Sequence, residues 1–265
     1  MTSRVVTVIS ACINVRFRTF TESHLTLEGK MENLILNSLP ESDYIRLSRH
    51  LRPVTLRLGD TIYQADEDIE YLYFPETVVF SMLSTMIDGS TTEVGLIGRE
   101  GMLGVRVVLG TLRTPHSAIV QMSGTAQRLS AQVFSENLAV SPALQTLALR
   151  YTQALIAQSR QGMACATQHS VAQRVARWLL MMADYTNSDQ LEVTHEVIAA
   201  LIGARRAGIS VIAQVFREEG LIEYQRGHVK ILNRARLEAE SCECYQVMKG
   251  EIEQLYIETF KNART

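Results

Sequence analysis

The stretch that decides the fold is THEVIAALIGARRAGISVIAQVFREEGLI, residues 194–222. Thr194 is a good N-cap for a helix from His195 to Ile202, and Gly203 permits the sharp turn that ends it. A second helix is expected to begin at Ala204 and to run to a C-cap at Gly220, because its apolar residues repeat at intervals of three and four. Two helices joined by a short glycine turn indicate a helix-turn-helix.

Predicted strands on both sides of this helix pair complete a winged helix. Leu191-Glu192-Val193 precedes the pair, and Ile222-Glu223-Tyr224 and Val229-Lys230-Ile231-Leu232 follow it as a hairpin. An amphipathic helix from Val171 to Leu180 comes first. This order of elements is typical of a winged helix-turn-helix.

The outer face of the second helix carries the candidate DNA contacts. An arginine fork suits the O6 and N7 atoms of guanine, whereas hydroxyls and an arginine in the wing suit phosphates. The alternative is a surface helix with solvated arginines. The residues predicted to bind DNA are Thr194, Arg205, Arg206, Ser210, Gln214 and Arg226.

The preceding part of the chain is rich in short strands. Alternating or β-rich runs include residues 54–58, 71–74, 78–87, 91–97 and 117–129. Asp88-Gly89-Ser90 is a strong hairpin signal, because both central residues can take a positive φ. We expect an antiparallel β-roll, that is, a double-stranded β-helix, and therefore an α+β chain.

From Pro142 onward the chain is expected to be helical for about 40 residues. Its apolar seam comprises Leu144, Leu147, Tyr151, Leu155, Gln158 and Gly162. A long helix with a narrow seam after a closed roll has no evident partner in its own chain, so we predict a homodimeric coiled coil. The alternative is a helix that packs along its own β-domain.

Taken in order, these elements resemble the Crp/Fnr family of bacterial transcription regulators over roughly Leu34 to Leu232. The segments that carry the resemblance are 98–104, 117–118, 194–203, 204–211 and 219–222. The resemblance implies a cyclic-nucleotide-binding-like sensor roll at 31–140, a dimerisation helix at 141–168 and a winged helix-turn-helix at 169–236. It also implies a cytoplasmic homodimer that binds palindromic double-stranded operator DNA and works with RNA polymerase.

The resemblance places an effector pocket at Gly98, Arg99, Glu100, Gly101, Met102, His116 and Ser117. In the family's cyclic-nucleotide binders an arginine grips the cyclic phosphate, and His116 takes that position here. A neutral imidazole cannot replace a bidentate guanidinium, so cyclic AMP is not expected, and the effector is unknown or absent. Ala207 and Val211 replace the family's commonest base-reading residues, which predicts a different operator sequence.

Composition sets outer limits on the function. The 265 residues carry a net charge of −2, with 46% hydrophobic residues, which excludes a disordered acidic protein, a collagen-like fibre and a histone-like basic protein. No apolar stretch reaches the roughly 18 residues that would span a bilayer. Residues 1–30 form a poorly defined leader, in which Ile9-Ser10-Ala11-Cys12 is lipobox-like; the alternative is a translation start at Met31.

Four cysteines are too few for a disulfide scaffold in a chain of this length. Cys242 and Cys244 are a possible metal or redox pair, but no third ligand is evident, so they are interpreted as ordinary residues and no metal or cofactor is predicted. An iron–sulfur cluster is not expected, because only Cys12 lies near the N-terminus. A haem ligand at His116 or His169 is also not expected, because single histidines carry no ligand spacing.

Two rival functions remain open. A cupin enzyme would need paired imidazoles, which the six histidines never supply, and no nucleophile elbow or phosphate loop is present; we expect no enzymatic activity. A sensor that acts through protein partners is the second rival. The C-terminal extension, 237–265, has apolar residues at helical spacing and either packs on the long helix or offers a partner surface.

Overall fold

The computed structural model describes residues 32–262, with side chains described through residue 257. The predicted leader with Cys12, and the alternative start at Met31, lie outside the described residues. In the part of the chain that is described, no helix is both long and apolar enough to cross a bilayer.

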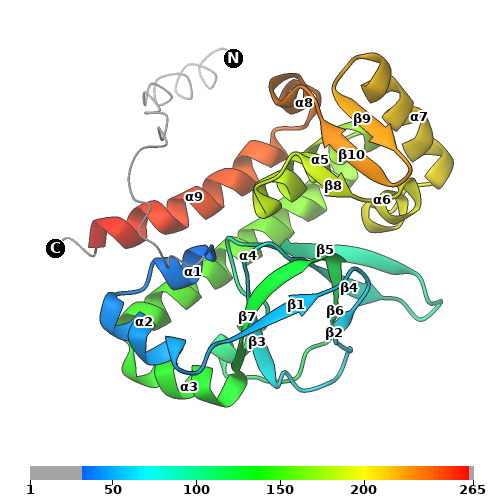
Figure 1. The fold of residues 1–265 in the computed structure, drawn as a ribbon. Coiled ribbons are helices and arrows are strands. Elements are labelled where there is room, and N and C mark those ends of the chain that lie inside the picture. The colour runs from blue at the N-terminus through cyan, green and yellow to red at the C-terminus, as the bar shows by residue number, and fades with distance from the viewer. Residues whose placement is uncertain (1–31, 263–265) are drawn as a thin grey trace, which may run out of the picture. The chain divides into compact units, whose positions relative to one another are not determined.

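Seven strands form two antiparallel sheets, as predicted for the roll (Figure 1). One sheet has the order β1-β7-β3 and the other β2-β6-β4-β5. The strands are β1 (Arg52–Leu56), β2 (Thr61–Tyr63), β3 (Tyr71–Pro75), β4 (Val79–Thr85), β5 (Thr91–Ile97), β6 (Ser117–Met122) and β7 (Gly124–Ser130). Short helices complete this part: α1 (Leu34–Asn37), α2 (Glu41–Ser48), the 3-10 helix η1 (Val105–Leu109) and α3 (Ala131–Val140).

The predicted hairpin joins β4 to β5, with Thr85 paired to Thr91. Gly89 has a φ of +83°, but Asp88 does not take a positive φ. Instead its carboxylate accepts hydrogen bonds from the N–H of Ser90 at 2.9 Å and from its hydroxyl at 2.7 Å. Two backbone hydrogen bonds also close the turn, from the N–H of Met86 to the carbonyl of Ser90 at 2.8 Å and from the N–H of Gly89 to the carbonyl of Met86 at 3.0 Å. The loop is longer than the two-residue hairpins that need two positive φ angles.

The long helix α4 covers Pro142–Gln168. It begins where the Ser141 hydroxyl accepts a hydrogen bond from the N–H of Leu144. The prediction that its apolar seam faces a second chain is wrong for three of the six residues proposed, because Leu144, Leu147 and Tyr151 are buried in the core of the roll. The sequence does not show this partner, because the roll surface that covers the seam comes from distant segments.

The winged helix contains α5 (Val171–Thr186), β8 (Gln190–Glu192), α6 (His195–Ile202), α7 (Arg206–Glu218), β9 (Ile222–Gln225) and β10 (His228–Ile231). Its three strands pair in the order β8-β10-β9. The bounds predicted for α6 are confirmed, whereas α7 begins two residues later than expected. The N–H of Ala204 bonds back to the carbonyl of Ala199 and so still belongs to the end of α6, while Arg205 takes the extended conformation of an N-cap.

The C-terminal extension packs back on the long helix, which is one of the two outcomes that the sequence leaves open. It begins within α8 (Arg234–Glu240) and continues as α9 (Cys244–Asn262), which runs alongside α4 (Figure 1). Met248 belongs to the winged-helix core and Leu255 to the core of the roll. The helix α9 therefore joins both halves of the described chain.

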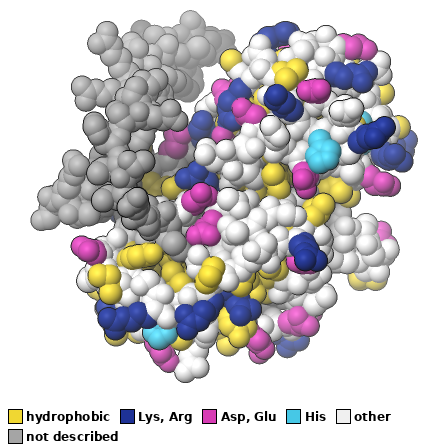
Figure 2. All heavy atoms as spheres, in the orientation of Figure 1, with side chains coloured by type: hydrophobic (Ala, Val, Ile, Leu, Met, Phe, Trp, Pro, Cys, Tyr) yellow, Lys and Arg dark blue, Asp and Glu magenta, His cyan; other side chains and the backbone are white. Residues whose placement is uncertain are grey.

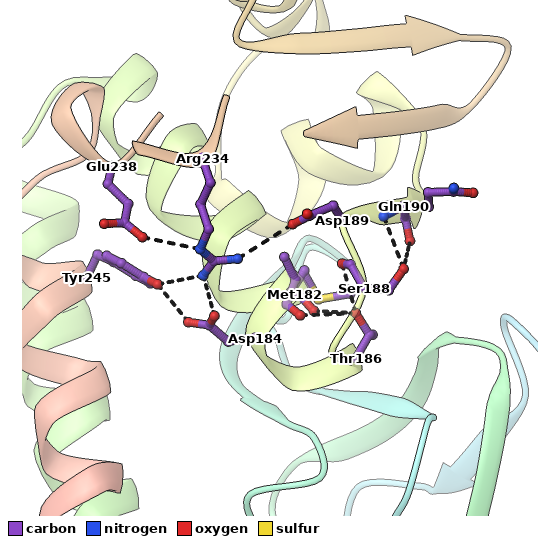
Figure 3. A network of polar contacts seen from close by, with 10 residues as sticks. Met182, Asp184, Thr186, Ser188, Asp189, Gln190, Arg234, Glu238 and Tyr245 are labelled. Carbon is purple, nitrogen blue, oxygen red and sulfur yellow. Dashed lines mark hydrogen bonds and ion pairs between the residues drawn. The ribbon is translucent and has the colours of Figure 1, made fainter. Parts of the chain in front are cut away.

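A polar network fixes the start of α9 to the winged helix (Figure 3). The Arg234 guanidinium bonds to Asp184 of α5 and, at 2.8 Å, to the Tyr245 hydroxyl of α9. That hydroxyl also donates to Asp184 at 2.8 Å, and Asp189 and Glu238 are further ion-pair partners of Arg234. These groups connect α5, α8 and α9.

Candidate DNA-binding surface and effector cavity

The turn between α6 and α7 presents two arginines to solvent. Gly203 has a φ of +68°, which ends α6 without the strain that a side chain would add. Arg205 and Arg206 follow at once and are exposed at the N-terminus of α7. Because helix N-termini attract anions, both side chains and the free backbone N–H groups favour a phosphate backbone at this point.

Ser210 shares the face of α7 that carries Arg206 and Gln214, but it is less exposed than they are. It is half-buried, its hydroxyl lies 3.0 Å from Nδ1 of His195 and it donates to the Arg206 carbonyl. His195 in turn stacks on Tyr224 of β9, with ring centroids 4.1 Å apart. Burial, and then the nearby charge of Arg206, lower the pKa of His195, so this imidazole is a neutral link between α6, α7 and the wing at pH 7.

The other residues predicted to contact DNA are exposed, but some of their side chains already make hydrogen bonds within the protein. The Gln214 amide donates to Glu218 at 2.8 Å, so this pair would have to break for Gln214 to reach a base. Arg226 has a φ of +49° at the tip of the wing. Thr194 caps α6 by accepting from the N–H of Val197, and it lies against Gly227 of the wing.

The face around these residues has mixed charge. Figure 2 shows Lys and Arg side chains interspersed with Asp and Glu over the part of the molecule that Figure 1 labels α7, β9 and β10. Residues 187–236 contain seven basic and six acidic side chains. Binding to DNA would therefore depend on a few aimed arginines more than on bulk charge.

A cavity of about 560 Å³ lies between the roll and the helices α4 and α5. This volume is typical of small-molecule sites. Its wall is mostly apolar, with Met82, Leu103, Leu155 and Trp178 among the lining residues. Its basic side chains are those of Arg106, Arg174 and Arg177, joined by His116 and opposed by the acid Glu93.

Two of these cavity groups are incompletely paired. Nδ1 of His116 and Nε of Arg177 are buried without a hydrogen-bond partner among the described residues. Arg174 donates to the carbonyl of Ile202, at the end of α6. The cavity therefore places unsatisfied hydrogen-bonding capacity beside the helix-turn-helix.

The structure does not gather the seven predicted pocket residues around one cavity. Only His116 lines the large one, while Arg99 and Glu100 line a second cavity of about 240 Å³ beside α9. A Cβ at Gly98 would lie 2.4 Å from Cβ of Tyr185, and Met102 is fully buried. These positions pack the roll against α4 and α5; Ser117 is half-buried on β6.

Glu100 is a buried acid and Glu93 is a half-buried one, and sequence reasoning did not single out either of them in this role. The Ser81 hydroxyl donates to Glu93 at 2.8 Å and the Trp178 indole N–H donates at 3.1 Å, which links β4, β5 and α5. Burial raises the pKa of Glu93 to about 7 and that of Glu100 to about 7. A glutamate in an alternating strand is normally read as solvent-facing, so the sequence carries no signal for this link.

Comparison with known proteins agrees with this arrangement. Residues 173–240 match the family described as the Crp-like helix-turn-helix domain, and the search of curated proteins found no match. Among solved structures, FixK2 from Bradyrhizobium japonicum aligns with a TM-score of 0.63 at 15% identity, over 72% of this chain and 98% of that one. A CRP-family transcriptional regulator from Thermus thermophilus aligns with a TM-score of 0.60 at 22% identity, over 71% and 96%.

A third similar structure is the c-di-GMP-responsive global regulator CLP from Xanthomonas campestris. It aligns with a TM-score of 0.58 at 14% identity, over 73% of this chain and all of that one. At these identities the structural matches establish the fold, and the helix-turn-helix match identifies the domain.

Proposed function

We propose that the chain is a Crp/Fnr-type transcription regulator, because residues 173–240 match the Crp-like helix-turn-helix domain and the fold is shared with such regulators, and that it binds operator DNA as a homodimer through Arg205, Arg206 and Arg226. The observation that carries this proposal is the pair of exposed arginines at the N-terminus of α7, directly after the turn. Thr194, beside the wing, supplies a phosphate contact, and Gln214 reaches a base once it leaves Glu218. A palindromic site and recruitment of RNA polymerase belong to the same proposal.

Selection of bound sequences from random DNA, followed by fluorescence anisotropy, tests the assignment. Changing Arg205 and Arg206 together to Ala should weaken specific binding at least 100-fold, because each good arginine–base pair contributes about 1–3 kcal/mol of discrimination. The control is Arg217→Ala, which removes an exposed arginine from the last turn of the same helix and should change affinity far less. Equal losses in both variants would contradict the proposed contacts.

Salt dependence separates DNA binding from a sensor that acts only through protein partners. Binding driven by phosphates weakens with salt at a log–log slope of about −0.9 per neutralised phosphate. We expect this log–log slope to be about −3 or steeper for the wild-type protein. The Arg226→Ala variant should have a shallower slope, because it neutralises fewer phosphates. A flat salt dependence would favour the protein-interaction alternative.

The effector that we propose is an anionic small molecule with an apolar body, held in the cavity between the roll and α4 and α5. Three arginines and His116 face one acid there, within a mostly apolar wall. His116 cannot grip a cyclic phosphate as an arginine does, so cyclic AMP is not the expected ligand. Calorimetric titration should show no tight binding of cyclic AMP or cyclic GMP; a micromolar dissociation constant for either would overturn this part.

An anionic, apolar dye tests the chemical class directly. The naphthalene sulfonate ANS should bind the protein and lose about tenfold in affinity in Arg106→Gln, which removes one cavity cation. Arg217→Gln, outside the cavity lining, is the matched control. An unchanged affinity in Arg106→Gln would show that the dye binds elsewhere or that charge in the cavity does not matter.

A further inference from the structure

Four potential metal ligands meet where the end of α4 lies against the start of α9. They are Cys165 and His169, one helical turn apart, and Cys242 and Cys244, which precede and open α9. Their ligand atoms all lie within 4.8 Å of one another. The sequence interpretation of Cys242 and Cys244 as ordinary residues rested on the lack of a third ligand; the fold supplies a third and a fourth from a helix 77 residues away along the chain.

The distances within the cluster fit one tetrahedral ion. The Sγ atoms of Cys165 and Cys242 are 3.5 Å apart, and Sγ of Cys244 lies 3.4 Å from Nδ1 of His169. A zinc ion with Zn–S bonds of about 2.3 Å places neighbouring ligand atoms about 3.5–3.8 Å apart. An iron–sulfur cluster contains several irons and would hold its ligand sulfurs much farther apart, so the geometry favours a single ion.

The surroundings are those of a closed site. All three cysteines are buried, and together they form a small core cluster of their own. Nε2 of His169 lies 3.2 Å from a carboxylate oxygen of Glu243, which leaves Nδ1 to face the sulfurs. The Gln161 amide also donates to Sγ of Cys244 at 3.0 Å. A histidine held by a carboxylate on its second nitrogen is the usual outer support of a zinc ligand.

We propose that Cys165, His169, Cys242 and Cys244 bind one Zn²⁺ ion in a structural site that joins α4 to α9. On binding, the three thiols release their protons to solvent and the neutral imidazole keeps its Nε2 proton toward Glu243. Three thiolates and one Zn²⁺ leave a net charge of −1. The positive charge of the Arg177 guanidinium favours the thiolate form of Cys165 and offsets the net charge of the site.

Four protein ligands, three thiolates and one imidazole, leave no open position on a tetrahedral ion, which indicates a structural site and not a catalytic one. The two halves of the site are separated widely in sequence, so the ion closes a long loop around α5, the helix-turn-helix and α8. It therefore holds the winged helix and α9 on the end of α4. This role is independent of which operator or effector the regulator recognises.

The test uses the full chain, purified under reducing conditions, with zinc measured by plasma mass spectrometry and by titration against a competing chelator. We expect one zinc per chain, and we expect Cys244→Ser and His169→Ala to lose it. Cys12→Ser changes the remaining cysteine and should keep the full stoichiometry. Wild-type protein without one-to-one zinc binding, or zinc lost from Cys12→Ser, would overturn the proposal.

Two further variants keep the test decisive if the serine variant folds poorly. His169→Cys retains four ligands, so it should still bind one zinc, and its cobalt-substituted form should show stronger sulfur-to-metal charge-transfer absorption than the wild-type cobalt form. Glu243→Gln should keep the stoichiometry and lose about 10–100-fold in affinity, as expected for an outer-shell partner. Identical cobalt spectra, or a Cys165–Cys242 disulfide found in place of the ion in reduced protein, would contradict a metal site.

Discussion

Single residues decide how closely the roll approaches α4. A Cβ at Gly101 would lie 2.0 Å from the hydroxyl oxygen of Tyr151 and 2.2 Å from Cζ of the same ring. The ring is fully buried and cannot move away without disturbing the core. We expect Gly101→Ala to lower the free energy of unfolding by about 1–3 kcal/mol, as overpacking does.

Calorimetry with a matched glycine checks this expectation. Gly250 lies within α9, and a Cβ there would meet nothing within 4 Å. Gly250→Ala should therefore raise stability by about 0.5–1 kcal/mol, because alanine is the better helix former. A Gly101→Ala protein as stable as wild type would show that Tyr151 has room to yield.

Glu93 should make stability depend on pH. In the unfolded chain a glutamate titrates near pH 4.3, whereas burial raises the pKa of Glu93 to about 7 in the folded protein. Between these two values the folded state holds a proton that the unfolded chain has lost, so the free energy of unfolding falls as pH rises through this window. Glu100 acts in the same direction.

Replacing Glu93 by Gln removes the part of the pH-dependent fall in the free energy of unfolding that comes from Glu93. At pH 8 Glu93→Gln should be more stable than wild type by about 1–3 kcal/mol, and at pH 4.5 the two should be nearly equal. Thermal melts from pH 4.5 to 8.5 measure the difference, with the exposed Glu196→Gln as the control for a lost charge. A constant difference across this range would show that Glu93 does not titrate inside it.

The helix α9 contacts the winged helix at one end and the roll at the other. Tyr245 is tied to Asp184 and Arg234 at one end, and at the other end the Tyr256 hydroxyl donates to the carbonyl of Glu100. Leu255 lies in the core of the roll. The helix α9 is therefore anchored at one end to the winged helix and at the other end to the roll.

Two apolar residues on α9 offer a matched pair. Leu255 is 4% exposed and Ile257 is 48% exposed. Leu255→Ala should destabilise the protein by about 2–5 kcal/mol and should lower the hydrogen-exchange protection of the C-terminal half of α9. Ile257→Ala should cost less than about 1 kcal/mol. Similar effects from both would mean that α9 does not hold the roll through this contact.

Local signals predicted the helix-turn-helix well, because its caps lie within the element they end. Thr194 and Gly203 mark the two ends of α6 in the sequence and in the structure. Long-range pairing was not predictable in the same way. The periodicity of α4 shows which residues are apolar but not which segment covers them, and the roll, not a second chain, covers Leu144 and Tyr151.

The cluster of Cys165, His169, Cys242 and Cys244 was also not predictable from the sequence, because its two halves come from distant segments. Cys165 and His169 stand at i and i+4, a spacing that puts two ligands on one helix face, and Cys242 and Cys244 are one residue apart. Either pair alone is a weak signal, and only the packing of α9 on α4 brings the pairs together. The spacing on α4 was the available clue.

In the described chain as a whole, the large cavity lies where an effector could influence DNA binding. Its lining includes Glu93 of the roll, Trp178 of α5 and Ile202 at the end of α6. A ligand shifts the regulator between two states only as far as its affinities for them differ. A ligand in this cavity would contact the roll and the winged helix at the same time. Its affinity would therefore differ between two states in which the roll and the winged helix are spaced differently.

The proposed dimer has a candidate surface on α4 that replaces the seam predicted from sequence. Leu149, Ile156 and Met163 are 46%, 46% and 65% exposed and stand seven residues apart on α4. A strict seven-residue repeat of apolar side chains is the pattern of a coiled-coil seam. We expect Leu149→Glu with Ile156→Glu to give a folded monomer by sedimentation, because two like charges would face each other at each layer.

Val140→Glu places the same charge at an exposed apolar residue on α3 and should leave the dimer intact. The monomeric variant should bind a single half-site as wild type does, yet lose about 10²–10⁴-fold on a palindromic site, since the second contact no longer benefits from effective concentration. Sedimentation velocity and anisotropy on both DNA lengths measure this together. If the variant with Leu149→Glu and Ile156→Glu remained dimeric, the dimer interface would have to lie on another surface.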